Sequence, residues 1–420
     1  MNFFKEQLSQ LILNPRKIIY KIYKVFSILV AFPLIVFMVI LRPFVLIRVG
    51  QLISSRLGHF AGNTEMYLCE RDHIYSARKV LDFFCLQDGN VCNEQLLKMF
   101  KRIIKIVPPY LNDLISSINL ILELLSNKIN FLGKHIAKPI NSDRDIKNIL
   151  ESSRQHIYFT KDELKFGEQK LIEWGIPQKT KLILVFARDS SYLTKFQPMV
   201  DFSYHDYRDC EIKKFSHFAN EFAKKGYYVL RMGVTAKEPL NVNNDKVIDY
   251  AFNGMRSDFM DIFLAHRCHF IITTGNGGDA PSIFNFRKPA GIVNFSPLFH
   301  IPTFLRKSVV LLKNHVDIKT KKTLTISEIY NRKVDSCLTE NCFLEKGVEL
   351  KENSPEEVLA VANEVEELIN IDFNKPLSTE QAKFNSKFIL DVELEGCKVH
   401  GSNLTRYSAN FLTLNPSWLD

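Results

Sequence analysis

The chain has 420 residues, of which 46% are hydrophobic and 24% charged, and its net charge is +9. This composition excludes a disordered chain, and the length is sufficient for two domains of ordinary size. The basic character favours an anionic partner. The sequence contains no zinc-finger spacing and no aromatic RNA-binding motif, so we expect no nucleic acid and consider lipid head groups and nucleotide phosphates instead.

An uncharged run of seventeen residues, 25–41, lies between basic residues near the N-terminus. No small-residue cleavage site follows it, which argues against a secretory signal peptide. Its length is at the lower limit for crossing a bilayer, and Pro33 lies in its middle. Because both flanks are basic, we expect a kinked or re-entrant anchor with both ends on the cytoplasmic face. A single membrane span and a buried helix of a soluble domain are the alternatives.

An α/β domain is expected to begin directly after this run. Residues 44–49 have the composition of a buried strand, and the glycines within 50–72 predict a glycine-rich loop after it. Residues 111–136 carry an apolar helical face that polar residues interrupt, which indicates a core helix and not a second membrane segment. The capping-box spacing of Thr160 and Glu163 predicts the start of a helix.

The second half of the chain alternates predicted strands and helices. Strands are expected at 181–187, 227–232, 247–251, 269–274, 289–295 and 309–312, and helices at 211–225, 257–266 and 354–369. This alternation implies a parallel sheet, whose ligands bind beyond the carboxyl ends of its strands. We therefore divide the chain into a basic leader and anchor (1–43), an N-terminal Rossmann-like domain (44–176), a C-terminal Rossmann-like domain (177–350), and a helix and tail that pack back on the body (351–420).

The stretch 266–295 organises this second half. It predicts a buried strand, a glycine-rich elbow, a short helix that opens near 279–281, and another strand. Such an elbow leaves backbone N–H groups at a helix N-terminus, which attract phosphate, although tight packing alone also explains its glycines. Four arginines lie beside the neighbouring strand ends and helix starts and favour a diphosphate-binding crevice, namely Arg188, Arg208, Arg231 and Arg256.

Several of these arginines have an alternative interpretation as partners in ion pairs. Arg188 is followed by Asp189, and Arg208 lies between Asp206 and Asp209. Asp258 suits the first turn of a helix whether or not it contacts a ligand. The complete predicted binding set is Arg188, Arg208, Arg231, Arg256, Asp258, Thr274, Gly275, Asn276, Gly277 and Ser282.

Six segments carry a further pattern, VFARDSSYL (185–193), DYRDCEI (206–212), KKGYYVLRMG (224–233), RKPAGIVNFSPL (287–298) and the stretches 41–72 and 249–277. They resemble a family of bacterial glycosyltransferases from surface-polysaccharide loci. The resemblance implies a GT-B-like fold, in which two Rossmann-like domains face a cleft and the second holds most of the nucleotide-sugar. A weaker likeness to fucosyltransferases implies that Arg188 binds the diphosphate of the donor.

The resemblance also implies an activity. We expect a membrane-associated, hexosyltransferase-like enzyme at the cytoplasmic face of the bacterial inner membrane. It would move a sugar from a nucleotide-sugar donor to a glycan or lipid-linked acceptor during the synthesis of a surface polysaccharide such as lipopolysaccharide. A catalytically inactive nucleotide-binding scaffold of a polysaccharide assembly complex is the alternative. A transferase of phosphoalditol units is a third possibility.

Glycosyl transfer needs a base near the acceptor hydroxyl. His59, in the predicted glycine-rich loop, is the first candidate, and Glu65 and Glu70 are the carboxylate candidates. A histidine that only donates structural hydrogen bonds is the alternative. No DxD-like motif lies in a suitable loop, and the eight cysteines show no CxxC spacing. We therefore expect metal-independent catalysis without a cofactor, and reduced thiols.

Overall fold

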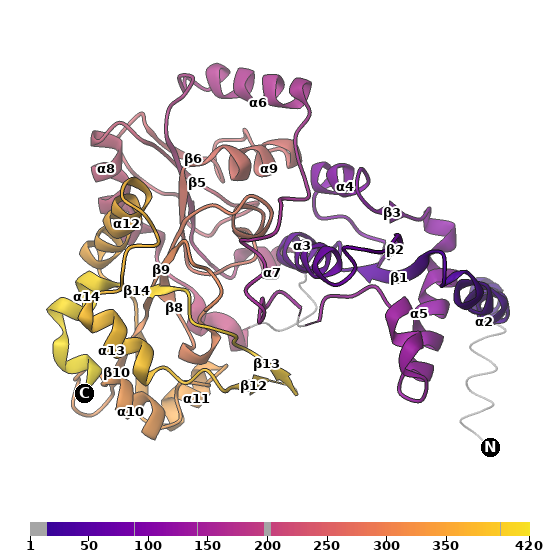
Figure 1. The fold of residues 1–420 in the computed structure, drawn as a ribbon. Coiled ribbons are helices and arrows are strands. Elements are labelled where there is room, and N and C mark those ends of the chain that lie inside the picture. Colours follow the sequence, from indigo (N-terminus) through magenta and orange to yellow (C-terminus); the bar gives the residue numbers. More distant parts are fainter. Residues whose placement is uncertain (1–14, 88, 141, 197–202, 395) are drawn as a thin grey trace. The chain divides into compact units, whose positions relative to one another are not determined.

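The computed structural model describes residues 15–420 except 88, 141, 197–202 and 395 (Figure 1). The chain divides into two compact units. Unit 1 comprises Met1–Arg56 and Tyr67–Ile140, and unit 2 comprises Leu57–Met66 and Asn141–Asp420. These units are defined by packing, and the expected domain boundaries after residues 43, 176 and 350 stay predictions.

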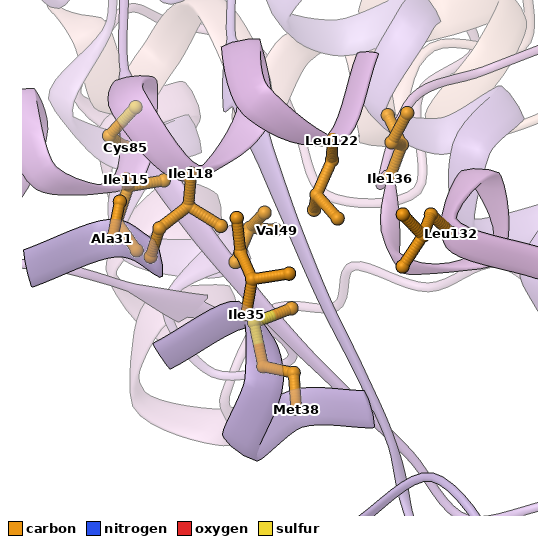
Figure 2. Packing of buried hydrophobic residues seen from close by; sticks show 10 residues of the cluster. All are labelled: Ala31, Ile35, Met38, Val49, Cys85, Ile115, Ile118, Leu122, Leu132 and Ile136. Carbon is orange, nitrogen blue, oxygen red and sulfur yellow. The ribbon is translucent and has the colours of Figure 1, made fainter. Parts of the chain in front are cut away.

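Unit 1 is built on a three-stranded parallel sheet in the order β1-β2-β3. Its strands are β1 (Leu46–Leu52), β2 (Val80–Leu86) and β3 (Lys105–Ile106), and its helices include α2 (Pro15–Leu41), α4 (Glu94–Phe100) and α5 (Asn112–Ser126). Helices α2 and α5 pack on each other, and α5 packs on β1. Figure 2 shows the core that results, in which three residues of α2 meet Val49, Cys85, Ile115, Ile118, Leu122, Leu132 and Ile136.

The predicted glycine-rich loop between residues 50 and 72 is wrong, because most of it is helix α3 (Leu57–Ile74). Its glycines allow close packing. A Cβ on Gly50, which lies within β1, would come within 2.0 Å of the Ala137 carbonyl oxygen. A Cβ on Gly58 would come within 2.8 Å of the Gly277 Cα, and one on Gly62 would press against Phe284. Tight packing, and not a turn, therefore explains the glycines of this segment.

Unit 2 confirms the prediction of a parallel α/β sheet. Seven strands pair in parallel in the order β14-β9-β8-β7-β4-β5-β6. They are β4 (Leu182–Phe186), β5 (Tyr228–Arg231), β6 (Val247–Asp249), β7 (Phe270–Thr273), β8 (Ala290–Phe295), β9 (Ser308–Leu312) and β14 (Arg406–Tyr407). The chain adds β5 and β6 on one side of β4 and then crosses to add β7, β8 and β9 on the other, as in doubly wound sheets.

Helices connect these strands and cover the sheet. The longer ones are α6 (Lys161–Glu173), α8 (Ser216–Lys224), α9 (Asp258–Arg267), α12 (Pro355–Asn370) and α13 (Thr379–Lys387), and the shorter ones are α7 (Ser191–Phe196), α10 (Ile326–Asn331), α11 (Glu340–Glu345) and α14 (Ala409–Leu414). The predicted capping box at Thr160 and Glu163 is present at the start of α6. Helix α12 packs on β8 and β9, and Gly291 of β8 leaves room for Val361 and Val365.

Two small antiparallel strand pairs complete unit 2, β10 (Asn314–Asp317) with β11 (Val348–Lys351), and β12 (Glu393–Leu394) with β13 (Cys397–Lys398). The tail then returns to the large sheet as β14. Cys337 and Cys342 are joined in a disulfide, so the expectation that all eight cysteines are reduced thiols is wrong for this pair. The described free cysteines are the other six.

Candidate functional site

The winding of the large sheet reverses between β4 and β7, which lie side by side with Phe186 paired to Thr273. The connections that follow these two strands leave in opposite directions, which is where doubly wound sheets bind ligands. The two loops are tied together at this point. Thr274 N–H donates to the Phe186 carbonyl at 3.0 Å, and Arg188 N–H donates to the Thr274 hydroxyl at 3.0 Å. The predicted elbow and the predicted Arg188 therefore do meet at one edge.

The elbow itself is a tight turn that uses its own donors. Gly275 has a φ of +73°, which favours glycine, and its N–H donates to the Thr273 hydroxyl at 3.0 Å. Gly278 N–H donates to the Asn276 side chain at 3.1 Å. Only one π-helical turn follows, Pro281–Asn285. The expectation that the N–H groups of the elbow are free for phosphate is therefore wrong for Gly275 and Gly278.

Three arginines surround this edge. The Arg208 guanidinium donates to the Gly275 carbonyl at 2.6 Å, and the Arg188 Nε lies 3.1 Å from an Asp209 oxygen. Arg144, which the sequence analysis missed, donates to the carbonyl of His300 at 2.9 Å. Burial lowers the pKa of Arg208, and the charge of Arg188 lowers it further. Burial also lowers the pKa of Arg144; the charge of Asp143 opposes this shift, and the charge of Arg208 adds a smaller contribution to it.

The positive charges of these arginines also affect the pKa values of neighbouring histidines. Burial lowers the pKa of His300 to about 3, and the charges of Arg144 and Arg208 add to this. Burial and Arg144 together lower the pKa of His400 to about 4. Cations that disfavour one another in this way gain if an anion enters among them. We call Arg144, Arg188 and Arg208 the arginine cluster.

One buried carboxyl group lies at the same edge. Burial raises the pKa of Asp279 to about 7, although a hydrogen bond from the Thr273 hydroxyl at 2.6 Å and the charge of Arg208 oppose the shift. A carboxyl group with this pKa is partly protonated near neutral pH. It therefore compensates the arginine cluster only in part.

A pocket of about 520 Å³ lies beside the cluster within unit 2. Its wall includes Ala187, Asp189, Tyr207 and Asp209, the residues on either side of Arg188 and Arg208. Eight carboxylates line the pocket, those of Asp189, Asp206, Asp209, Glu211, Glu238, Glu340, Glu349 and Glu352, against the cations Arg231, Lys237 and Lys313. This balance disfavours phosphate inside the pocket, whereas carboxylates accept hydrogen bonds from hydroxyl groups.

The other predicted arginines are compensated by carboxylates. Arg231 is 1% exposed and lies 3.4 Å from Asp249 and 3.6 Å from Asp189. Arg256 lies 3.2 Å from Asp258 and 2.8 Å from Asp261. The sequence analysis gave an ion-pair alternative for Arg188 and Arg208, and not for Arg231 or Arg256. Ser282 is fully buried.

The predicted catalytic residues have separate surroundings. His59 is half-buried in the first turn of α3, next to Gly58 and its close contact with Gly277. Glu65 is fully buried, 2.9 Å from the Nδ1 of His156 and 2.8 Å from the guanidinium of Arg287. A carboxylate held in this way has no surface open to an acceptor, which argues against Glu65 as the base. Glu70 lies in unit 1 and accepts the Ile140 N–H at 2.8 Å.

Two residues of the site were not among the predicted binding residues. Arg144 lies in a loop that no predicted strand precedes, so the strand-end argument did not reach it. The available signal was the Asp-Arg-Asp sequence at 143–145, which resembles the surroundings of Arg208. Asp279 was predicted only as part of a helix start, and its burial depends on the fold of the elbow.

No family model matches this chain, and no curated protein does. Solved structures that are similar to it include two transferases. A glycosyl transferase of family 9 from Veillonella parvula is 13% identical, with a TM-score of 0.44 over 77% of this chain and 97% of that one. The E. coli ADP-heptose lps heptosyltransferase II is 12% identical, with a TM-score of 0.43 over 76% and 98%. At these values neither likeness bears on activity.

Proposed function

We propose that this chain is a glycosyltransferase that binds a nucleotide-sugar at the edge of the large sheet of unit 2. The observation that carries the proposal is the arginine cluster at the reversal of the strand order. Burial lowers the pKa values of Arg208 and Arg144, to which the charge of Arg188 adds at Arg208 and the charge of Arg208 adds at Arg144. The cluster therefore carries an excess of positive charge over Asp209, the ion-pair partner of Arg188. A diphosphate supplies the missing negative charge, and guanidinium groups bind its oxygens with two parallel hydrogen bonds.

The pocket next to the cluster fits the uncharged part of such a donor. Its carboxylates repel phosphate but accept hydrogen bonds from the hydroxyl groups of a ribose or a hexose. Asp189 and Asp209 line this pocket, while the adjoining Arg188 and Arg208 contact the elbow. A cationic site that suits the diphosphate and a carboxylate-lined pocket that suits the hydroxyl groups of a nucleotide-sugar thus lie side by side.

The same cluster suits the chemical step. Negative charge develops on the departing diphosphate during glycosyl transfer, and prearranged cations stabilise it. The acceptor hydroxyl must lose a proton to a base. We assign this role to His59, since the first turn of α3 packs on the elbow through Gly58. The mechanism uses no metal ion or cofactor in this proposal.

The acceptor is a glycan or a lipid-linked glycan in the synthesis of a surface polysaccharide at the cytoplasmic face of the bacterial inner membrane. The resemblance of six segments to glycosyltransferases of surface-polysaccharide loci supports this part of the proposal. The apolar run within α2 supports membrane association. The GT-B arrangement of two facing domains and the binding of membrane lipids belong to the same proposal.

An inactive nucleotide-binding scaffold is the second candidate. One observation favours it: of the predicted bases, Glu65 is fully buried in ion pairs. The scaffold and the enzyme share the donor site and differ only in turnover.

A panel of nucleotide-sugars and nucleoside diphosphates tests the proposal. A ligand that binds only the folded chain stabilises it by mass action and so raises its melting temperature. At a ligand concentration of a hundred times Kd, the free energy of unfolding rises by about 2.7 kcal/mol. We expect the matching donor and its nucleoside diphosphate to raise the melting temperature, and the free nucleoside to have little effect. Release of nucleoside diphosphate with an acceptor present supports the enzyme, and binding without release supports the scaffold. No shift with any member of the panel would overturn the nucleotide site.

A further inference from the structure

Helix α2 has two unlike faces. On one, Ala31, Ile35 and Met38 are at most 6% exposed and point into the core of unit 1 (Figure 2). The opposite face is apolar yet open. Its exposed fractions are 61% for Phe26, 68% for Leu29, 61% for Phe32, 53% for Phe37 and 63% for Ile40. Only 22% of the apolar window Tyr23–Leu41 is buried. A core helix of a soluble domain does not leave such a face uncovered.

The open face continues onto residues outside α2. At its N-terminal end the Tyr23 hydroxyl donates to the carbonyl of Tyr110, whose side chain is 70% exposed. At its C-terminal end the Arg42 guanidinium lies 5.0 Å from the ring of Phe131, which is 39% exposed. Phe44, just beyond the helix, is 80% exposed. Aromatic rings at both ends of an apolar surface, with a cation at one of them, suit the head-group region of a bilayer.

The buried face of α2 argues against a membrane span. A span would place Ala31, Ile35 and Met38 in the hydrocarbon, together with the α5 residues that pack on them. Helix α5 carries Asp113 and Glu123, and charged residues are costly at that depth. Helix α2 could otherwise span the bilayer only by detaching from the rest of unit 1, which would expose the core of that unit. A helix that lies in the membrane plane avoids both costs.

The charge of the chain is divided unequally between the units. Unit 1 has 18 lysines and arginines against 8 aspartates and glutamates, a net charge of +10. Unit 2 has 37 against 38, a net charge of −1. The whole excess of positive charge therefore belongs to the unit that carries the apolar face, which complements an anionic lipid surface.

We infer that unit 1 docks on an anionic leaflet with α2 parallel to the membrane plane, its open face inserted about 5–10 Å. Tyr110 and Phe131 lie at head-group level at the two ends of the open face. The inference rests on the membrane association proposed above and is independent of glycosyl transfer. It replaces the re-entrant and spanning arrangements with a surface-bound one.

Depth measurements along α2 test this arrangement. Single tryptophans replace Phe26, Phe32 and Ile40 in the full chain, in which Trp174 and Trp418 are changed to Phe. Each variant is bound to vesicles whose lipids carry bromine at a shallow or a deep acyl position. We expect the shallow bromines to quench all three tryptophans to a similar extent. Stronger quenching of Phe32→Trp by the deep bromines, with the end positions shallow, would overturn the in-plane arrangement.

A binding assay tests the surface itself. Phe32→Glu should lower partitioning to vesicles that contain phosphatidylglycerol by about tenfold or more, because the charge opposes insertion of that face. Leu414→Glu, at a residue of unit 2 that is 72% exposed, is the matched control and should bind as the unchanged chain does. The chain should bind less to vesicles of phosphatidylcholine alone. Added salt should reduce only the extra binding that the anionic lipid contributes. Equal binding of Phe32→Glu and the unchanged chain would refute the surface.

The donor site provides an independent readout. The melting-temperature shift with nucleotide-sugar should be the same in Phe32→Glu as in the unchanged chain. Loss of vesicle binding with the nucleotide shift intact supports the docking surface alone. Vesicle binding without any nucleotide shift leaves the docking surface standing and removes the proposed function.

Discussion

Replacing Arg208 with alanine separates a ligand-binding arginine from a structural one. In the free protein the side chain makes one hydrogen bond, to the Gly275 carbonyl, worth about 1 kcal/mol. Its burial and its repulsion from Arg188 offset that gain, since both lower its pKa. We therefore expect Arg208→Ala to change the stability of the free protein by no more than about 1 kcal/mol. A charge-assisted contact to phosphate contributes about 1.5–3 kcal/mol, so the Kd for nucleoside diphosphate should rise by about 10- to 100-fold.

Arg256→Ala is the matched control for this substitution. Arg256 is also a predicted site residue, but its charge is already balanced by Asp258 and Asp261. Its removal should lower the melting temperature and leave the Kd unchanged. Calorimetric titration with the nucleoside diphosphate that gives the largest shift measures both variants, and Arg188→Ala should behave as Arg208→Ala does. If Arg208→Ala binds nucleoside diphosphate as the unchanged chain does, the arginine cluster is not a phosphate site.

Three further substitutions test the surroundings of this site. Asp279 has a folded pKa of about 7 against about 3.9 unfolded, so its contribution to stability is present at low pH and is lost as pH rises to 7. In thermal unfolding, the stability of the unchanged chain should fall between pH 5 and 8 by roughly 2–3 kcal/mol more than that of Asp279→Asn. Asp391→Asn, at an exposed carboxylate, is the control and should follow the unchanged chain. Identical pH dependence in all three proteins would contradict the burial argument. His59→Ala should lower turnover by about 10²- to 10⁴-fold with donor affinity unchanged, and undiminished transfer would remove His59 as the base. Glu65→Gln should instead destabilise the fold by about 3–5 kcal/mol, because it leaves Arg287 without its buried carboxylate partner. A stable but inactive Glu65→Gln protein would restore Glu65 as a catalytic candidate.

The sheet of unit 2 could be predicted from the sequence because its signals are local. Buried β-branched runs mark the strands, and glycines and caps mark where helices begin and end. The position of Arg188 after β4 and of Thr274 after β7 then follows, since parallel strands end at one edge. The glycines of α3 were misinterpreted because a glycine at a turn and a glycine at a close approach give the same signal. Only the neighbour, Gly277 in the case of Gly58, distinguishes them.

Which arginine is available to a ligand could not be predicted, because the answer depends on residues that are distant in sequence. Arg208 and Arg231 both lie next to aspartates or strand ends in the sequence. In the fold, Asp249 at the end of β6 and Asp189 after β4 both approach Arg231, whereas Arg208 faces a backbone carbonyl and another arginine. The disulfide between Cys337 and Cys342 could not be predicted for a different reason: the two cysteines are only five residues apart, but no pairing pattern marks them.

The net charge of +9 predicted an anionic partner but did not say where it binds. Divided by unit, the charge indicates two anionic partners that are held by different physical means. Unit 1, at +10, presents a broad positive field around an apolar face, which suits a lipid surface whose charges are many and mobile. Unit 2, at −1, has no such field. Its proposed diphosphate site depends instead on three arginines brought together at one edge, next to an acidic pocket that disfavours phosphate. High salt should therefore weaken the anionic part of membrane binding far more than it weakens donor binding, because desolvated contacts are screened less than surface charge.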